Sequence, residues 1–273
     1  PNVYVQGSFR LGTTIRPSND AEEYDVDSVC ELQKLAKPSL TQLQLKTLIG
    51  MEIEAYCKAQ SMKKPLREGR RCWVLEYADG AQFHMDVVPA LPNGQSVRVL
   101  LESRGFDARW AKTAIAITDN KSATYTAITD DWPRSNPKGY CEWFKSRMAT
   151  ALERRKRMLA ESVKARVEDI PDYKVRTPLQ AAVMILKRHR DNTFKDRKED
   201  RPISVIITTL AAHSYNGEET IGETLAAILA GMNSHILWRD NRYWIPNPTD
   251  PLENFADKWL EYPERASAFA EWL

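Results

Sequence analysis

The sequence has few cysteines, and none of them stands in a recognisable ligand pattern. No CxxC pair occurs, and no histidine follows a cysteine at zinc-finger spacing. A structural zinc site and a disulfide scaffold are therefore excluded, and we expect reduced thiols that mostly serve packing. The four cysteines are Cys30, Cys57, Cys72 and Cys141.

Long apolar runs and an excess of one charge are also missing. No stretch approaches the roughly 20 apolar residues of a membrane span, and the start does not resemble a signal peptide, so we expect a cytoplasmic protein without a membrane partner. A net charge of +2 and a pI near 8.4 argue against a general nucleic-acid binder. The chain opens at Pro1, directly before a strand-like VYVQGS, so an upstream element such as an N-terminal helix is expected outside this sequence.

What the sequence does contain is enough apolar surface for two lobes. With 42% hydrophobic and 28% charged residues among 273, the chain can bury a substantial core. Residues 1–90 predict an α/β lobe, and the second half predicts helices. A loop-rich stretch ending in WPRSNPKGY lies between them, so we predict lobes at 1–135 and 136–273.

In the first lobe, VYVQGS and YDVDSVCEL predict two strands, and RCWVLEYA and AQFHMDVV predict a hairpin around Asp79-Gly80. Ser39 with Gln42 predicts a capping box that starts a helix running to about Met62. The residues predicted on the inner side of this helix are Leu45, Leu48, Ile49, Ile53 and Tyr56.

In the second lobe, CEWFKSRMATALERRKRMLAES predicts one long helix. Thr177 and Pro178 predict the N-cap and first turn of the helix LQAAVMILKRHRDNTF, and GETLAAILAGMNS predicts a further helix. ISVIITTLAAHSY suits either a strand, by its β-branched run, or a helix, by its length.

The residues that carry chemistry are three aspartates and a Gly-Ser pair. Asp25 and Asp27 alternate along a predicted strand, so both carboxylates project from one face, about 7 Å apart. Asp86 lies in an otherwise apolar strand that we expect beside the first. Crowded carboxylates repel unless cations offset them, and Mg²⁺, which prefers hard oxygen ligands, is the natural counterion. We therefore predict two Mg²⁺ or Mn²⁺ ions at this point, with Gly7 and Ser8 forming a turn that meets phosphate oxygens.

Two simpler interpretations compete with this site. A lone DxD on a solvated edge strand is common, but its combination with a Gly-Ser turn and a later aspartate is typical of polymerase-β-like nucleotidyltransferases. GSFRLGTT also matches the spacing of a P-loop. Thr13 stands where the lysine should be, however, so the P-loop interpretation is unattractive.

Seven segments in order resemble the cGAS/DncV-like nucleotidyltransferases (CD-NTases) of bacterial anti-phage signalling. The segments are VYVQGSFRLGTTI, YDVDSVCEL, FHMDVVPA, WPRSNPKGY, LKRHRDNTF, ISVIITTLAA and IPNPTDPLENFADKW. The 16 residues between Ser8 and Asp25 are a mild departure from the wider superfamily. The resemblance implies a polymerase-β-like α/β (α+β) lobe with a mixed sheet, a helical second lobe, and an active site in the cleft between them.

The resemblance also implies an activity and further site residues. The activity is synthesis of a cyclic di- or trinucleotide from ATP, GTP or pyrimidine triphosphates; a separate effector senses the product, a regulatory protein partner is possible, and nucleic-acid binding is not required. Lys187 and Ser204 would bind the triphosphate from the helical lobe, although a solvated helix face explains the charges around Lys187 equally well. Phe9 and Tyr243 are candidates for base stacking or for the core.

Two further features of the sequence stay open. His84 shares a strand face with Asp86, either as a group supporting the aspartates or as a neighbour. The basic run 154–157 either attracts nucleic acid or is the solvent-exposed side of a helix.

The resulting hypothesis is a cyclic-oligonucleotide synthase in which Asp25, Asp27 and Asp86 bind the metal pair and Asp86 helps deprotonate the acceptor hydroxyl. A nucleotidyltransferase that makes linear oligonucleotides or modifies protein or RNA remains an alternative, as does a catalytically silent nucleotide sensor. Modest net charge makes a plain RNA-binding module unattractive.

Overall fold

The computed structural model describes residues 1–17, 24–77 and 83–273 and divides the chain into two compact units. Unit 1 consists of Pro1–Arg10 and Arg16–Tyr140, and unit 2 of Leu11–Ile15 and Cys141–Leu273. Five residues between the first two strands thus belong to the unit that is otherwise built from the second half of the chain. None of the helices in the described ranges is long and apolar enough to cross a membrane.

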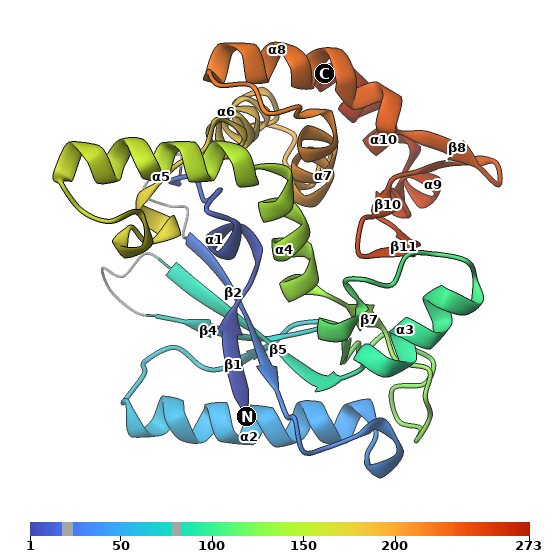
Figure 1. The fold of residues 1–273 in the computed structure, drawn as a ribbon. Coiled ribbons are helices and arrows are strands. Elements are labelled where there is room, and N and C mark those ends of the chain that lie inside the picture. The colour runs from blue at the N-terminus through green and yellow to red at the C-terminus, as the bar shows by residue number, and fades with distance from the viewer. Residues whose placement is uncertain (18–23, 78–82) are drawn as a thin grey trace. The chain divides into compact units, whose positions relative to one another are not determined.

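Unit 1 is built around a mixed β-sheet of seven strands in the described residues, with the main order β1-β2-β5-β4-β3 and with β6 and β7 extending from β5 (Figure 1). β2 and β5 are parallel, and every other described pair in this sheet is antiparallel. The strands are β1 Asn2–Val5, β2 Tyr24–Glu31, β3 Arg67–Glu68, β4 Trp73–Glu76, β5 Phe83–Pro92, β6 Ile115–Ile117 and β7 Arg134–Ser135. The helices are α1 Gly7–Leu11, which ends at the boundary with unit 2, α2 Gln42–Ala59 and α3 Gly94–Ser103.

The two strands predicted from VYVQGS and YDVDSVCEL are confirmed, and so is the antiparallel pairing of the predicted hairpin, as β4 with β5. The Asp79-Gly80 turn lies outside the described residues.

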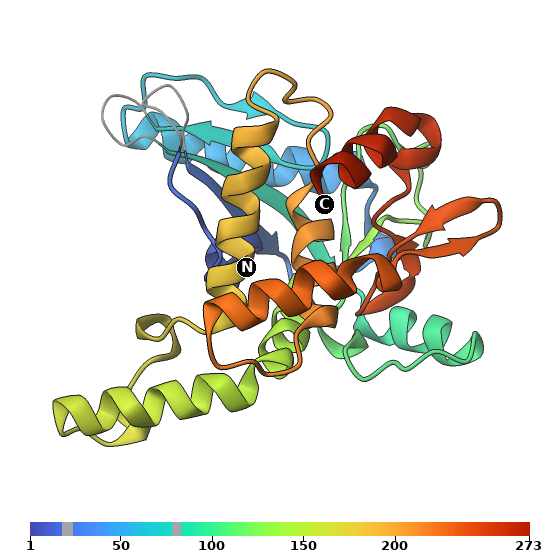
Figure 2. The ribbon, with the colours of Figure 1, turned by 90° about the horizontal axis from the view of Figure 1, so that it is seen from above.

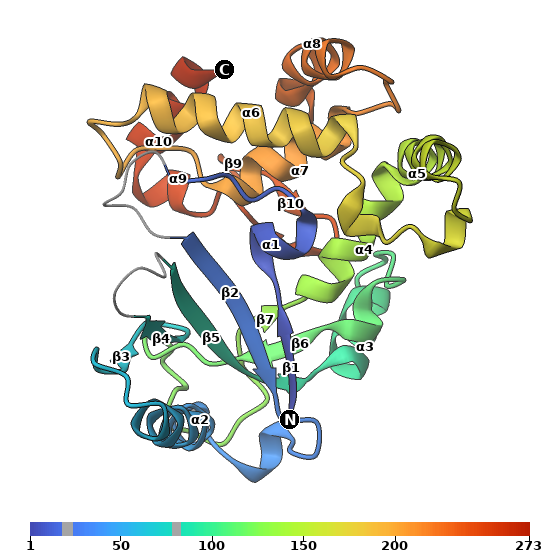
Figure 3. The ribbon, with the colours of Figure 1, turned by 90° about the vertical axis from the view of Figure 1, so that its left-hand side faces the viewer.

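Helix α2 covers one face of the sheet (Figure 3). Leu45 and Ile49 of α2 pack in one cluster with Leu75, Val87 and Leu91 of the strands. Burying these side chains stabilises the unit by about 2 kcal/mol each. Because strand side chains alternate, the opposite face of β2 and β5 is the one free to carry polar groups.

The predicted start and inner face of this helix were partly wrong. Thr41, not Ser39, is the N-cap, in a capping box with Gln44. Leu48 and Tyr56 are 43% and 46% exposed, because only the arc at Leu45 and Ile49 faces the sheet.

Unit 2 is predominantly helical, with α6, α7 and α8 packed against one another (Figure 2). Its helices are α4 Pro137–Arg147, which begins just before the boundary, α5 Ala149–Val163, α6 Pro178–Thr193, α7 Ser204–Ser214, α8 Ile221–Gly231, α9 Lys258–Glu261 and α10 Pro263–Trp272. Two small antiparallel pairs complete it: β8 Leu237–Arg239 with β9 Arg242–Trp244, and β10 Pro246–Asn247 with β11 Asp250–Asn254.

The helix predicted from Thr177 and Pro178 is confirmed as α6, with a capping box between Thr177 and Gln180. The helix predicted from GETLAAILAGMNS is confirmed as α8. The ambiguous ISVIITTLAAHSY forms helix α7, which is buried nearly all round, as its uniform hydrophobicity requires.

The prediction of one long helix over CEWFKSRMATALERRKRMLAES was wrong, because the chain breaks into α4 and α5 at Met148. The Met148 side chain is buried, and the Thr177 hydroxyl donates to its sulfur at 3.1 Å. The preceding Arg147 donates to the carbonyls of Ala212 and Tyr215 at 2.8 and 2.9 Å. The break therefore coincides with contacts of Arg147 and Met148 to other parts of unit 2.

Candidate active site

The register of two parallel strands brings the predicted acidic residues together. Asp27 of β2 lies directly beside Asp86 of β5, and Asp25 lies directly beside His84. In a parallel pair, residues in register project from the same face. All four side chains therefore lie on the face opposite α2. On the α2 side, Met85, Val87 and Leu91 of β5 pack in the apolar cluster instead.

Three of these side chains converge closely enough to share one cation. Asp25, His84 and Asp86 each offer a ligand atom, and these atoms lie within 4.8 Å of one another. The imidazole Nε2 of His84 is 3.2 Å from Asp25 Oδ1. On Asp86, Oδ1 is buried and has no hydrogen-bond partner among the described residues, whereas Oδ2 accepts the Cys72 thiol at 3.3 Å. A buried carboxylate oxygen without a donor is the feature that a divalent cation satisfies.

Burial and repulsion shape the titration of this group. Burial raises the pKa of Asp25, and the charge of Asp86 raises it further, while His84 lowers it. Burial, together with the charges of Asp86 and Asp27, raises the pKa of the Cys72 thiol to about 12. The thiol therefore stays protonated and donates to Asp86. A positive ion at this point would lower the free energy of every carboxylate around it.

The Gly-Ser pair lies against the same carboxylates. The backbone N–H of Gln6 donates to the Asp27 carbonyl at 2.8 Å, which sets the start of α1 beside β2. Gly7 has φ +61°, and a Cβ at this position would stand 2.2 Å from Asp27 Oδ2. Only glycine fits both the backbone conformation and the space. Ser8 follows in the first turn of α1.

Lys187 and Ser204 lie in unit 2, apart in sequence and in unit from the aspartates. Lys187 is 5% exposed, and its Nζ donates to the Thr13 carbonyl at 2.9 Å. The Ser204 hydroxyl accepts from Arg190 Nη1 at 2.9 Å. Both contacts are structural, and the phosphate-binding role of these two residues stays a prediction.

Two residues near the aspartates were missed or undervalued by sequence reasoning. The sequence analysis named His84, which stands two residues before Asp86 in the same strand, but left its role open. Cys72 precedes β4, and nothing local signals its contact with Asp86, which depends on the pairing of β4 with β5.

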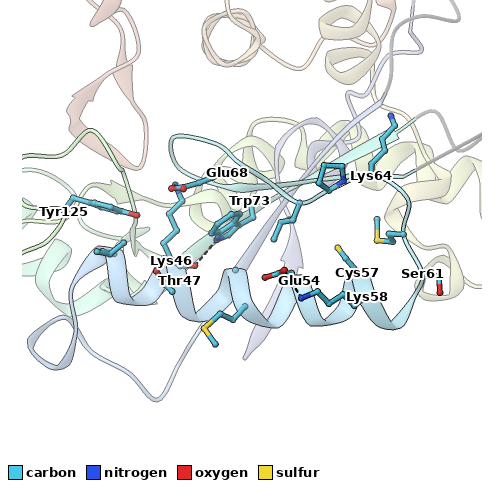
Figure 4. Close-up of a pocket in the computed structure, with 16 residues that line it drawn as sticks. Lys46, Thr47, Glu54, Cys57, Lys58, Ser61, Lys64, Glu68, Trp73 and Tyr125 are labelled. Atoms are coloured by element: carbon cyan, nitrogen blue, oxygen red, sulfur yellow. Dashed lines mark hydrogen bonds and ion pairs between the residues drawn. The ribbon is translucent and has the colours of Figure 1, made fainter.

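A buried lysine, also missed, supports the segment that carries Cys72. Lys46 of α2 is 1% exposed; its Nζ donates to the carbonyls of Gly69 and Arg70 at 2.5 and 3.0 Å and pairs with Glu68 at 2.9 Å. It also lines a cavity of about 770 Å³ along α2, together with Trp73 (Figure 4). Trp73 lies in register with Val87, so this cavity is on the α2 side of the sheet and not on the carboxylate face.

The weaker sequence candidates have ordinary surroundings. Phe9 is 41% exposed and meets Tyr24 edge-on, and Tyr243 packs edge-on against Trp238 and Trp259. The basic run 154–157 is ion-paired at three positions, in the pairs Arg154–Glu219, Lys156–Asp172 and Arg157–Glu153.

Comparison with known proteins gives one family match and two curated relatives. Residues 1–89 match the family described as cyclic GMP-AMP synthase DncV-like, nucleotidyltransferase domain. A c-di-GMP synthase of Roseivirga ehrenbergii is 31% identical over 99% of this chain, and the cyclic dinucleotide synthase CdnG of Bradyrhizobium diazoefficiens is 25% identical over 99%. The chain spans 64% and 62% of the length of these two relatives.

Solved structures show the same fold. The structure of Bradyrhizobium diazoefficiens CdnG in complex with GTP aligns with a TM-score of 0.66 at 21% identity, over 99% of this chain and 75% of that one. The Vibrio cholerae DncV cyclic AMP-GMP synthase in complex with the linear intermediate 5′ pppA(3′,5′)pG aligns with a TM-score of 0.60 at 15% identity, over 99% and 62%. The expected polymerase-β-like α/β fold followed by a helical part is thereby confirmed.

Proposed function

Because the chain belongs to the cGAS/DncV-like nucleotidyltransferase (CD-NTase) family, we propose that it synthesises a cyclic dinucleotide from nucleoside triphosphates. The observation that carries the proposal is the pairing of Asp27 with Asp86 and of Asp25 with His84 across two parallel strands. This pairing concentrates three carboxylates on one face beside a glycine-containing turn. Phosphoryl transfer needs little else from a protein than positioning and charge stabilisation.

The carboxylates are the proposed metal ligands. Asp25, Asp27 and Asp86 would hold two divalent cations, Mg²⁺ or Mn²⁺, which when bound would offset charge on the triphosphate and on the transferring phosphoryl group. Asp25 and Asp86 have ligand atoms within 4.8 Å of each other, and Asp27 lies beside Asp86 in the register. The donor set fits such ions, because the oxygens are hard ligands and Asp86 Oδ1 is buried without a hydrogen-bond partner among the described residues.

The chain's own groups have separate tasks. Asp86 would help deprotonate the attacking hydroxyl, and the Cys72 thiol donates to its Oδ2 and holds the carboxylate in place. Gly7 lets the backbone approach Asp27 closely, so that the N–H groups and the Ser8 hydroxyl at the start of α1 can meet phosphate oxygens. Lys187 and Ser204 remain proposed triphosphate contacts on the resemblance alone.

Both curated relatives are named as cyclic dinucleotide synthases, one of them as a c-di-GMP synthase, and one solved relative binds GTP. GTP is therefore the proposed first substrate, with a second GTP, ATP or a pyrimidine triphosphate as the other. We propose that the product is a second messenger of anti-phage (CBASS) signalling, sensed by a separate effector.

The test is incubation of the protein with Mg²⁺ or Mn²⁺ and all four ribonucleoside triphosphates, singly and in pairs, followed by ion-exchange chromatography and mass spectrometry. A cyclic dinucleotide that is lost in Asp27→Asn supports the proposal. If the products are linear oligonucleotides, the protein is a polymer-forming nucleotidyltransferase and not a cyclic dinucleotide synthase. Nucleotide binding without any phosphodiester product would instead make it a silent sensor.

A further inference from the structure

His84 is the histidine of the acidic cluster formed with Asp25 and Asp86. It lies directly beside Asp25 in the parallel register and two residues before Asp86 on the same strand face. Both neighbours are proposed metal ligands. A side chain in this position affects how the ions bind, either as a ligand or through its contact with the carboxylate ligands.

The imidazole is aimed at the point where the carboxylates meet. Its Nε2 lies 3.2 Å from Asp25 Oδ1, and one ligand atom from each of Asp25, His84 and Asp86 lies within 4.8 Å of the other two. Metal–ligand bonds of about 2.0 to 2.2 Å to nitrogen and oxygen place ligands of one ion up to about 4.4 Å apart, so a small contraction brings all three atoms into one coordination sphere. The His84 side chain is 29% exposed, which leaves it open to an ion from solvent.

Imidazole nitrogen changes what kind of ion such a site prefers. Mg²⁺ binds oxygen ligands almost exclusively and keeps several waters, whereas first-row transition ions accept imidazole readily. Three aspartates without His84 would favour a hard ion. Adding one nitrogen raises the affinity for a transition ion while giving Mg²⁺ little.

We infer that His84 is a metal ligand beside Asp25 and Asp86 and that it makes this site prefer a divalent transition-metal ion, with Mn²⁺ as the probe, over Mg²⁺. The inference rests on the proposed function, because the ions concerned are those of the proposed transfer site. It adds a ligand and a selectivity that the three aspartates alone do not provide.

The competing role for His84 is a hydrogen bond that orients Asp25. The two roles differ in their effect on selectivity. Losing an orienting hydrogen bond weakens every ion that Asp25 holds, while losing a nitrogen ligand weakens Mn²⁺ selectively.

The experiment measures metal binding directly, without nucleotide. Free Mn²⁺ is followed by electron paramagnetic resonance in a titration of the whole chain, and Mg²⁺ affinity is obtained by competition. Co²⁺ absorption in the visible range reports the ligand set independently. The variant is His84→Asn, which has an amide but no imidazole nitrogen. His189→Asn, at an exposed histidine in unit 2, controls for adventitious binding to surface histidines.

We expect His84→Asn to weaken Mn²⁺ binding by about tenfold or more and Mg²⁺ binding by less than about threefold, with a changed Co²⁺ spectrum. His189→Asn should leave all three readouts unchanged. Equal weakening of Mn²⁺ and Mg²⁺, or no change in either, overturns the inference. If the variant selectively loses Mn²⁺ binding but the protein forms no phosphodiester product, the proposed function is wrong and this inference holds. If the protein forms product but the variant keeps the same Mn²⁺-over-Mg²⁺ selectivity, the proposed function holds and this inference is wrong.

Discussion

Lys187 of unit 2 and Asp86 of unit 1 represent two different surroundings of charge in this protein. In unit 2, the buried cations Lys187 and Arg190 donate to the carbonyls of Thr13 and Pro202, each at 2.9 Å. In unit 1, Asp86 keeps a buried oxygen without a hydrogen-bond partner among the described residues, beside two further carboxylates. A buried charge whose hydrogen bonds are satisfied can support a fold, whereas a crowded carboxylate with one unsatisfied oxygen costs stability and is typical of a functional site.

The largest effect should come from removing one crowded charge. We expect Asp86→Asn to lower the rate of phosphodiester formation by about 10³-fold and, in the absence of metal, to leave the melting temperature unchanged or raised, because repulsion is relieved. Product formation and thermal unfolding measure the two effects. A variant that is clearly less stable without metal would break the comparison, since Asp86 would then be a structural charge.

The second effect concerns a charge that has its partner. Lys187→Met removes the donor to the Thr13 carbonyl, so we expect unit 2 to lose about 3 kcal/mol of unfolding free energy. Chemical denaturation measures it, with Arg188→Met, on the same helix but less buried, as the control. Unchanged stability with weakened triphosphate binding would instead favour the predicted phosphate role.

The third effect is steric and concerns Gly7, whose backbone lies close to the Asp27 carboxylate. Gly7→Ala introduces a Cβ against Asp27 Oδ2 at a positive φ, so we expect a loss of about 2 kcal/mol and at least a tenfold lower rate. Gly105→Ala shares the positive φ but has open space around it, so it should show the backbone cost alone, about 1 kcal/mol, with normal activity.

The smallest expected effect is a different dependence of stability on pH in the two units. Burial, with help from His235 and Arg147, lowers the pKa of His213 in unit 2 to about 4, below its usual 6.5. The unfolded chain then binds more protons in this window, so stability is present above pH 6.5 and is lost as pH falls towards 4. With discounting for solvent, the loss should be about 1 kcal/mol, and His213→Gln should remove it.

In unit 1, hydrogen bonds from Arg70, Lys121 and Arg71 outweigh burial and lower the pKa of Asp119 to about 2. Its contribution to stability is lost only as pH falls from about 3.8 towards 2. Hydrogen exchange at pH 5 compared with pH 7 should therefore report loosening in unit 2 and not around Asp119. Uniform loosening would contradict the difference.

The parts predicted from sequence are those that depend on local or alternating patterns. The aspartates could be placed on one face because strand alternation is fixed, and Thr177 with Pro178 marks a helix start by residue type alone. The start of α2 could not be chosen locally, because Ser39 and Thr41 are each followed by glutamine at the third position. The Gln42 side chain accepts the Asp119 N–H at 2.9 Å, a contact across 77 residues that leaves Gln44 for the cap.

Other features also depend on distant partners. The break at Met148 contains neither glycine nor proline and follows from burial against Thr177. The contacts of Lys46 with Gly69 and of Cys72 with Asp86 join separate elements, so residue type alone does not reveal them.

The short excursion of Leu11–Ile15 into unit 2 has a consequence for how the chain is completed during synthesis. The Leu11 and Thr13 carbonyls receive their donors from Gln180 and Lys187, which follow 169 and 174 residues later. These five residues emerge from the ribosome early, but their hydrogen bonds to α6 can form only after α6 has been translated. A cut after Tyr140 would separate the Gln180 and Lys187 donors from the Leu11 and Thr13 carbonyls, so we expect the second half to be more stable when residues 11–15 are supplied to it as a peptide.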